Sequence, residues 1–250
     1  VFYMLYVGFT AWLKPQAAPA VVDRPELDSK FVKQLLAGLL PPLALILAVL
    51  GSILSGIATP TEAAAVGAAG ATILALVYGQ LNLSRLKEVT DGTLKVTSMI
   101  FMIFIGAAIF SLVFRGFGGD EQVQALFEAM PGGKLGAMLV VMLVIFLLGF
   151  ILDFIEITFV VVPIVAPILL AMGIDPVWLG IMIAINLQTS FLTPPFGFAL
   201  FYLRGVAPKE LPTSAIYKGV APFIAIQVGM LVLLSFVPEL ATWLPDKLYG

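Results

Sequence analysis

The chain has 250 residues, of which 61% are hydrophobic and 11% are charged, and its formal net charge is -2. Soluble domains contain roughly 45–50% apolar and about 25% charged residues, so this composition predicts a polytopic membrane protein. The sequence contains no Cys and no His, which excludes disulfides, thiolate chemistry, imidazole metal sites and histidine-based acid–base catalysis. The net charge gives no indication of nucleic-acid binding.

The N-terminal segment, residues 1–13, is apolar but too short to cross a bilayer, and it lacks the basic region of a signal peptide. We interpret it as the end of a membrane helix whose beginning precedes the sequence, in a fragment or in a natural truncation. A polar loop follows. The first complete span is then predicted at about residues 35–57.

A helix start is predicted at Thr59. This residue fits the N-cap, Pro60 fits the first helical position, and Glu62 fits the third position, which together make a capping box. The helix that follows is rich in Ala and Gly, and small residues let helices approach closely in lipid. We therefore interpret this segment as a capped, tightly packed membrane helix rather than as a binding site.

Residues 82–96 are polar and amphipathic, which is typical of a helix that lies in the membrane interface. A span is predicted from about residue 97 to residue 114, and a loop with a short helix follows it. Residues 135–149 form a further apolar segment that is just long enough to cross the membrane.

The next apolar segment is too long for one span. If residues 135–172 formed one straight helix, it would far exceed the roughly 20 residues that cross a bilayer. Pro163 and Pro167 also interrupt it. We therefore expect a re-entrant helical hairpin over residues 151–173, with its turn near Val162 and Pro163.

Asp153, Glu156 and Thr158 lie in this expected hairpin. The two carboxylates are spaced to share one face of a helix. Carboxylates within a membrane are costly and are candidates for function, here the attraction of a cation or the binding of a proton. They could equally lie hydrated at the mouth of the hairpin, near the lipid headgroups. The sequence leaves both readings open.

A second polar interruption lies within the apolar run 177–203. Two consecutive prolines cannot continue a helix, so we predict a helix broken near the bilayer midplane, where such breaks line cavities. Hydroxyls and freed carbonyls suit a hard cation such as Na⁺. Polar contacts between neighbouring helices are the alternative, but they do not require a proline break, so we favour a cation or substrate path. Its candidate residues are Gln188, Thr189, Ser190, Thr193, Pro194, Pro195 and Gly197.

The last span is predicted at about residues 216–237, and Trp243 and Tyr249 beyond it suit an interfacial belt. Taken together, the segments predict an all-α polytopic membrane protein with about six transmembrane helices, a partial N-terminal helix, one re-entrant helical hairpin and one Pro-Pro-broken helix. The chain contains no nucleophile–base motif, so we do not expect an enzyme.

Four motifs together resemble a known family. They lie at residues 56–66, at residues 148–157, in the Pro163/Pro167 segment that ends at residues 173–176, and at residues 186–195. In order and spacing they are similar, along essentially the whole chain, to the C-terminal half of the large membrane subunit of TRAP (tripartite ATP-independent periplasmic) transporters. Residues 187–204 resemble the subgroup often labelled mannitol/chloroaromatic.

The resemblance implies one repeat of an elevator-type secondary transporter in the bacterial inner membrane, with Na⁺ as the coupling ion and no other cofactor. It implies that the hairpin and the broken helix contribute to one Na⁺ site and to one side of the path of an organic acid. The implied parts are scaffold-type helices at 1–81, an interfacial arm at 82–96, a transport-type domain at 97–205 and a C-terminal helix and tail at 206–250.

The implied partners are membrane lipid, the N-terminal half of the large subunit, a small membrane subunit and a periplasmic solute-binding protein that delivers the carboxylate. Half of an elevator fold contains half of the substrate site. An alternative is therefore a truncated, transporter-derived chain that acts as a non-transporting structural or accessory subunit of another membrane protein complex. Co-purification with unrelated membrane proteins would favour this alternative.

Overall fold

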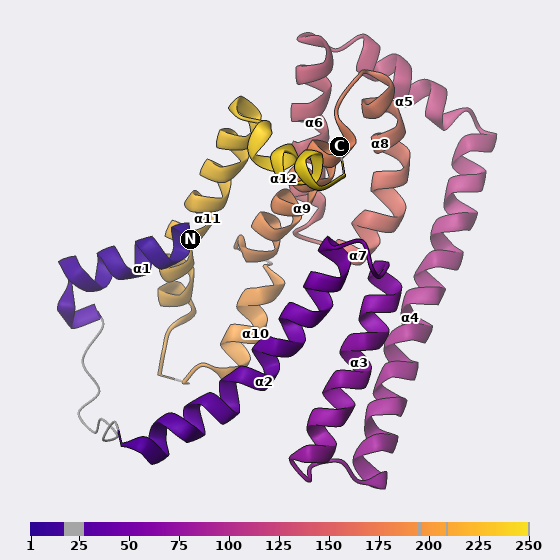
Figure 1. The fold of residues 1–250 in the computed structure, drawn as a ribbon. Helices are drawn as coiled ribbons and strands as arrows, with labels where there is room; N and C mark the ends of the chain where they lie inside the picture. The colour runs from indigo at the N-terminus through magenta and orange to yellow at the C-terminus, as the bar shows by residue number, and fades with distance from the viewer. Residues whose placement is uncertain (18–27, 195–196, 209, 250) are drawn as a thin grey trace. The chain divides into compact units, whose positions relative to one another are not determined.

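The computed structural model describes residues 1–17, 28–194, 197–208 and 210–249 (Figure 1). These residues are helical almost throughout and contain no strand, which confirms the predicted all-α class. The helices are α1 Phe2–Leu13, α2 Ser29–Leu54, α3 Pro60–Val77, α4 Leu83–Gly116, α5 Gly119–Glu128, α6 Gly133–Leu148, α7 Phe154–Glu156, α8 Val162–Ala171, α9 Pro176–Leu192, α10 Phe198–Val206, α11 Thr213–Phe236 and α12 Glu239–Tyr249.

Within the described residues, 5 helical segments are long and apolar enough to cross a membrane. Four of them are α2, α3, α4 and α11, and the fifth is the helical segment Phe154–Ala171, which includes α7 and α8. Helices α1, α6 and α9 are apolar but shorter. Since one span needs about 20 residues, these lengths confirm the polytopic membrane class.

The chain divides into two compact units, one formed by residues 8–96 and the other by residues 1–7 and 97–250. Helix α4 has 34 residues and passes from the first unit to the second between Val96 and Thr97. The expected interfacial arm and the span expected after it therefore belong to one continuous helix. The scaffold, arm and transport roles of these segments stay predictions.

In the unit of residues 8–96, the start of α3 is fixed by the predicted capping box. The Thr59 hydroxyl oxygen accepts the Glu62 N–H at 3.3 Å, and a Glu62 carboxylate oxygen accepts the Thr59 N–H at 2.8 Å. Small residues also let α2 approach α3 closely, as predicted. A Cβ added at Gly70 would lie 2.3 Å from a methyl carbon of Leu45.

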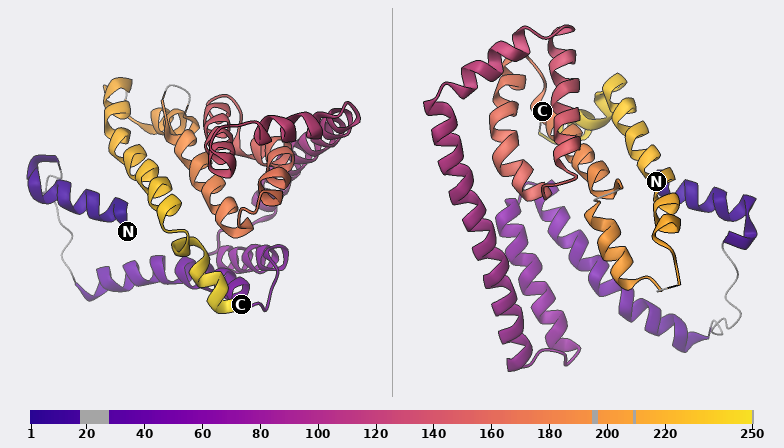
Figure 2. Two further views of the ribbon diagram at one scale, coloured as in Figure 1. Left: turned by 90° about the horizontal axis from the view of Figure 1, so that it is seen from above. Right: turned by 180° about the vertical axis from the view of Figure 1, so that it is seen from behind.

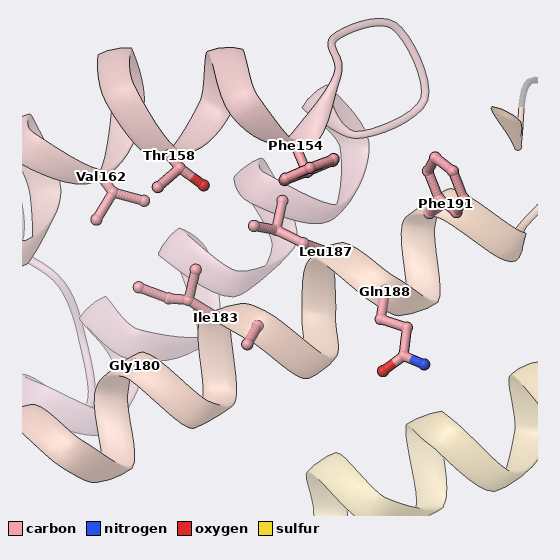
Figure 3. Close-up of a pocket in the computed structure, with 9 residues that line it drawn as sticks. Phe154, Thr158, Val162, Gly180, Ile183, Leu187, Gln188 and Phe191 are labelled. Carbon is pink, nitrogen blue, oxygen red and sulfur yellow. The ribbon is translucent and has the colours of Figure 1, made fainter. Parts of the chain in front are cut away.

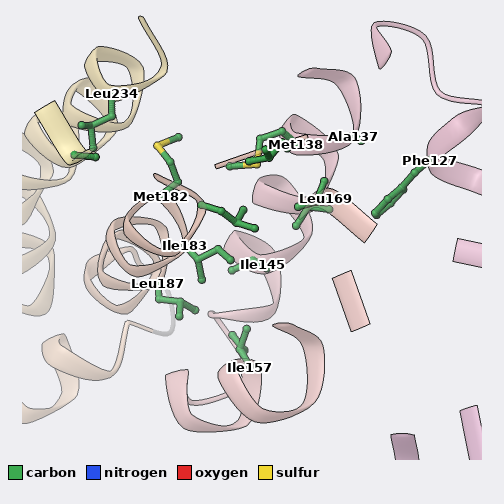
Figure 4. Close-up of a cluster of buried hydrophobic side chains, with 14 residues drawn as sticks. Phe127, Ala137, Met138, Ile145, Ile157, Leu169, Met182, Ile183, Leu187 and Leu234 are labelled. Atoms are coloured by element: carbon green, nitrogen blue, oxygen red, sulfur yellow. The ribbon is translucent and has the colours of Figure 1, made fainter. Parts of the chain in front are cut away.

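Helix α9 is central to the other unit, because it packs against α6 and also contacts α10, α11 and α12 (Figure 1). The Trp178 indole N–H donates to the Leu234 carbonyl at 2.8 Å and so ties the start of α9 to α11. One cluster of buried apolar side chains joins these helices to the hairpin (Figure 4). Its fully buried members include Ile145, Ile157, Leu169 and Leu234.

The structure corrects the position of the helical hairpin. Its arms are α6 and the helical segment Phe154–Ala171, which lie side by side and are joined by residues 149–153 (Figures 1 and 2). No reversal occurs near Val162 and Pro163, where the turn was expected. The hairpin therefore begins in α6, before the predicted range 151–173.

A π-helical turn at Ile157–Val161 explains why Pro163 does not reverse the chain. In a regular α-helix, the proline ring would clash with the carbonyl four residues earlier. The π-helical turn shifts the hydrogen-bond register, so that the Val162 N–H donates to the Ile157 carbonyl. The helix then continues through Pro163, which lies in the first turn of α8.

The difference in burial between two positions on α6 predicts a difference in the free energy of unfolding of their alanine variants. Ile145 is fully buried, whereas Leu143 is 56% exposed. Ile145→Ala should lower the free energy of unfolding by about 2–4 kcal/mol, because it removes buried methyl groups and leaves a cavity. Leu143→Ala should change it by about 0.5 kcal/mol or less. Unfolding of the purified protein in detergent measures both, and equal losses would contradict the core assignment.

Candidate functional site

The tip of the hairpin, residues 149–153, lies directly against the last turn of α9. A Cβ added at Gly149 would lie 2.1 Å from the Ser190 Oγ atom and 2.7 Å from the Ser190 Cβ atom. These distances are far below van der Waals contact, so this approach requires glycine at position 149. The fold thus brings the two polar interruptions predicted from the sequence into contact.

A buried amide makes a second tie between α9 and the hairpin. Asn186 is 3% exposed, and its Nδ2 atom donates to the Met142 carbonyl on α6 at 2.8 Å. Asn186 was not among the candidate site residues predicted from the sequence. The feature that could have identified it is a side-chain amide one helical turn before Ser190 in an otherwise apolar run.

Three hydroxyls near the end of α9 donate to carbonyls of the same helix. Thr189 and Ser190 are buried, and they donate to the carbonyls of residues 185 and 187 at 2.7 and 2.9 Å. Thr193 donates to the Thr189 carbonyl at 2.7 Å. Because each hydroxyl uses its proton in this way, its oxygen lone pairs stay available as acceptors or cation ligands.

The predicted break follows these hydroxyls. Helix α9 ends at Leu192, Thr193 is extended with φ -87° and ψ 126°, and α10 begins at Phe198. Gly197 closes the break: its N–H donates to the Thr193 carbonyl at 3.0 Å, and an added Cβ would lie 2.8 Å from the Phe191 carbonyl oxygen. Pro194 lies in the turn, whereas Pro195 lies outside the described residues.

The helix dipoles place partial charges of opposite sign on the two sides of the break. The C-terminal carbonyls of a helix carry partial negative charge and favour cations, and the N-terminal N–H groups favour anions. The end of α9 therefore suits a cation, and the start of α10 suits a carboxylate. The described residues contain no group of three or more Asp, Glu, His or Cys placed to hold a metal ion. A cation site here would therefore consist of hydroxyl and carbonyl oxygens.

The two carboxylates of the hairpin have different environments. Asp153 is the N-cap of α7, and its carboxylate accepts the Phe154 N–H at 2.7 Å. Glu156 lies at the end of α7, and both residues are half-buried. Asp153 thus precedes the helix and caps it, which differs from the expectation that both carboxylates share one helical face.

A cavity of about 550 Å³ lies between the hairpin and α9 (Figure 3). Thr158 and Gln188, both predicted site residues, line it from the two sides. Apolar side chains make up most of the wall, including Phe154, Leu187 and Phe191. The Gln188 amide extends away from Thr158, toward the pale yellow helix α11 in Figure 3.

This architecture defines a class of proteins. A discontinuous helix that presents hydroxyls, carbonyls and helix ends is a typical feature of secondary transporters among multi-pass helical membrane proteins. Comparison with known proteins agrees, since residues 1–240 match the family described as "Tripartite ATP-independent periplasmic transporter, DctM component". The chain belongs to this family, whose members are transporters rather than enzymes. It is a multi-pass protein of the bacterial inner membrane.

Three relatives illustrate the similarity. The C4-dicarboxylate TRAP transporter large permease protein DctM of Vibrio cholerae is 32% identical over 83% of this chain and 50% of its own length. The sialic acid TRAP transporter large permease protein SiaM of Vibrio cholerae is 30% identical over 88% and 51%. The ectoine/5-hydroxyectoine TRAP transporter large permease protein UehC of Ruegeria pomeroyi is 29% identical over 84% and 49%. The chain thus spans about half the length of the curated relatives it matches.

The close contact at Gly149 gives a prediction. Gly149→Ala should destabilise the protein by about 1–3 kcal/mol, because the new methyl group overlaps the Ser190 side chain. Gly106→Ala on α4 is the matched control, since an added Cβ there meets no atom within 4 Å. Ser190→Gly should recover part of the loss in the double variant, which thermal unfolding measures. Equal effects at residues 149 and 106 would contradict the contact.

Proposed function

We propose that this chain is the C-terminal half of the large membrane subunit of a Na⁺-coupled, receptor-dependent secondary transporter that takes up organic acids by an elevator mechanism. One observation carries the proposal: the tip of the hairpin meets the broken helix at the Gly149–Ser190 contact. Two interruptions of membrane helices thereby form one polar region, which is where such transporters bind their ions and solutes.

The cation is assigned to the end of α9. Buried hydroxyls at Thr189 and Ser190 lie beside the partly exposed hydroxyl of Thr193 and the last carbonyls of the helix. These are uncharged oxygen ligands of the kind that hard cations prefer. The negative end of the α9 dipole adds to their attraction for Na⁺.

The carboxylate of the solute is assigned to the start of α10, near Gly197, because the N-terminus of a helix favours an anion. Gly197 is buried, and the close packing of the Phe191 and Thr193 carbonyls against it requires glycine at the start of α10. Thr158 and Gln188 would line the path beside it. In this assignment Asp153 and Glu156 attract cations to the mouth of the site, and Asp153 also orders the tip by capping α7.

The division of the chain supports the elevator part of the proposal. An elevator needs a moving unit and a scaffold, and the chain forms two compact units that α4 joins as one helix. We assign residues 1–81 to the scaffold, 82–96 to an interfacial arm, 97–205 to the transport domain and 206–250 to a C-terminal helix and tail. The compact units match this division only near residue 96, because residues 1–7 and 206–250 belong to the same unit as residues 97–205. We also propose that the N-terminal half of the subunit supplies the second hairpin and the second broken helix that a full site needs.

The names of relatives in the family support a proposal for the solute class and the partners. Two of the relatives are named for C4-dicarboxylates and for sialic acid, which are organic acids. We propose a carboxylate for this protein as well, delivered by a periplasmic solute-binding protein. A small membrane subunit would complete the assembly.

The hydroxyl of Thr193 provides the test of Na⁺ coupling. Thr193→Val keeps the shape of the side chain but removes the hydroxyl oxygen, so it should raise the Na⁺ concentration for half-maximal uptake about tenfold, as expected for loss of one ligand worth about 1.4 kcal/mol. Uptake of succinate and N-acetylneuraminate by proteoliposomes that contain the complete transporter and its receptor measures this change.

Thr193→Ser is the matched control, because it retains the hydroxyl and should keep the Na⁺ dependence of the wild type. If Thr193→Val and Thr193→Ser showed the same Na⁺ dependence, the ion site would have to lie elsewhere. If the wild-type protein took up the solutes equally well without a Na⁺ gradient, Na⁺ coupling itself would be wrong.

A further inference from the structure

A second cavity lies on the other side of α9, between α9, α11 and the first residues of α1. Its volume is about 280 Å³. The residues that line it include Gln188 on α9, Gln227 on α11 and the aromatic ring of Tyr3. Since Gln188 lines both cavities, this second cavity adjoins the candidate solute path.

Gln227 is the most unusual polar group of this unit. It lies well inside α11, a membrane-spanning helix of 24 residues, and is only 5% exposed. Neither its Oε1 atom nor its Nε2 atom has a hydrogen-bond partner within the part of the chain that the structure describes. A buried amide without partners costs free energy, and no described protein group relieves this cost at Gln227. Its donor and acceptor groups are therefore available to a ligand.

The lining determines the chemistry of that ligand. Val1, with its amino group, is among the residues that line the cavity, but none of the described residues that line it has a charged side chain, and Ile185, Ile226 and Met230 supply apolar surface. A charged group of a solute would therefore be buried without a charged side chain as its partner, which is unfavourable. A carboxamide offers both a donor and an acceptor. A neutral group that itself donates and accepts, such as a hydroxyl or a carboxamide, satisfies it fully.

We propose that this cavity is a second binding site on the solute path, which takes a neutral hydrogen-bonding group of the solute, a hydroxyl or a carboxamide, between the amides of Gln227 and Gln188. The view in Figure 3 agrees with this role, because Gln188 extends toward α11. The inference rests on the proposed transport function. It assigns the charged end of the solute to the helix break and the uncharged polar part to the two amides.

The first experiment compares two C4-dicarboxylates that differ by one hydroxyl, L-malate and succinate. Their uptake is measured in proteoliposomes with the complete transporter, as wild type, as Gln227→Leu and as Gln124→Leu. Gln124 lies on α5 and lines a different cavity, so it controls for the same chemical change. Gln227→Leu should raise KM for L-malate about tenfold, because the hydroxyl loses its partner. KM for succinate and the Na⁺ dependence should change less than about twofold.

Thermal unfolding separates this role from a structural one. Gln227→Leu removes an unpartnered amide from the protein interior, so the unfolding temperature should stay equal or rise. A lower unfolding temperature with equal losses of L-malate and succinate uptake would show that Gln227 only supports the fold and would overturn the proposal.

The second experiment does not depend on transport. The chain contains no cysteine, so Gln227→Cys can be placed in the complete permease with any other cysteines replaced. A small, membrane-impermeant cationic methanethiosulfonate should modify this thiol, because a ligand cavity opens to water. Val232→Cys is the control on the same helix, where Val232 is an exposed apolar residue. A lipid-facing thiol there should react at least about tenfold more slowly, since lipid suppresses the thiolate.

The outcomes separate this inference from the proposed function. Reaction of Gln227→Cys together with the selective loss of L-malate affinity would support the site. If the wild type transported either acid but Gln227→Leu left both KM values unchanged, the inference would be wrong and the proposed function would stand. If the wild type transported neither acid, the proposed function would fail for these solutes. The reactivity of the thiol at residue 227 would then show whether the cavity is accessible to a ligand. An unreactive thiol at residue 227 overturns the inference in every case.

Discussion

The site depends on the absence of a side chain at Gly149. Residues 149–153 reverse the chain between two apolar helical segments, and the backbone groups of such a reversal must find partners in protein wherever it lies in lipid. The tip meets this constraint by lying directly on the last turn of α9, where a Cβ at position 149 would overlap Ser190. The amide of Asn186 then bonds the Met142 carbonyl of α6 and fixes the two elements in register. The broken helix and the hairpin therefore form one structural element, and changes at one of them are felt at the other.

The hydroxyls of this element serve the fold and the site with the same atoms. Each donates its proton to a carbonyl near the end of α9, and the Thr193 hydroxyl in this way satisfies the Thr189 carbonyl, which the break would otherwise leave without a partner. The oxygen lone pairs of the same hydroxyls stay free to accept, and nearby helix ends supply partial charges of both signs. A carboxylate-rich site would bind a cation more strongly, but within the membrane it would also cost far more to leave empty. Neutral oxygens would suit the proposed site, where an ion has to be bound and released in each transport cycle.

Local features of the sequence predicted the fold class, the capping box at Thr59 and the break after Leu192, because each depends on residues that are neighbours in the chain. The position of the hairpin could not be predicted in this way. Pro163 does not force a reversal, because the helix continues through it after the π-helical turn at residues 157–161, where the hydrogen-bond register shifts. The partners of Asn186 and Gly149 lie on other helices. Their roles depend on tertiary packing, which a pattern along the chain does not contain.

For the same reason, the sequence alone does not indicate a binding role for Gln227. A single glutamine in an apolar span is compatible with a polar contact between helices, and such contacts are common in membrane proteins. The structure excludes this ordinary explanation within the described part of the chain, because α9 and α11 pack together and yet leave both polar atoms of the amide without a partner. The two polar regions along α9 therefore differ in kind. The break offers helix ends and suits charge, whereas the cavity at Gln227 offers neutral amides and suits a neutral group. A solute that carries both a carboxylate and a hydroxyl or amide would match the two regions together, and one that lacks the neutral group would leave the amide unpaired.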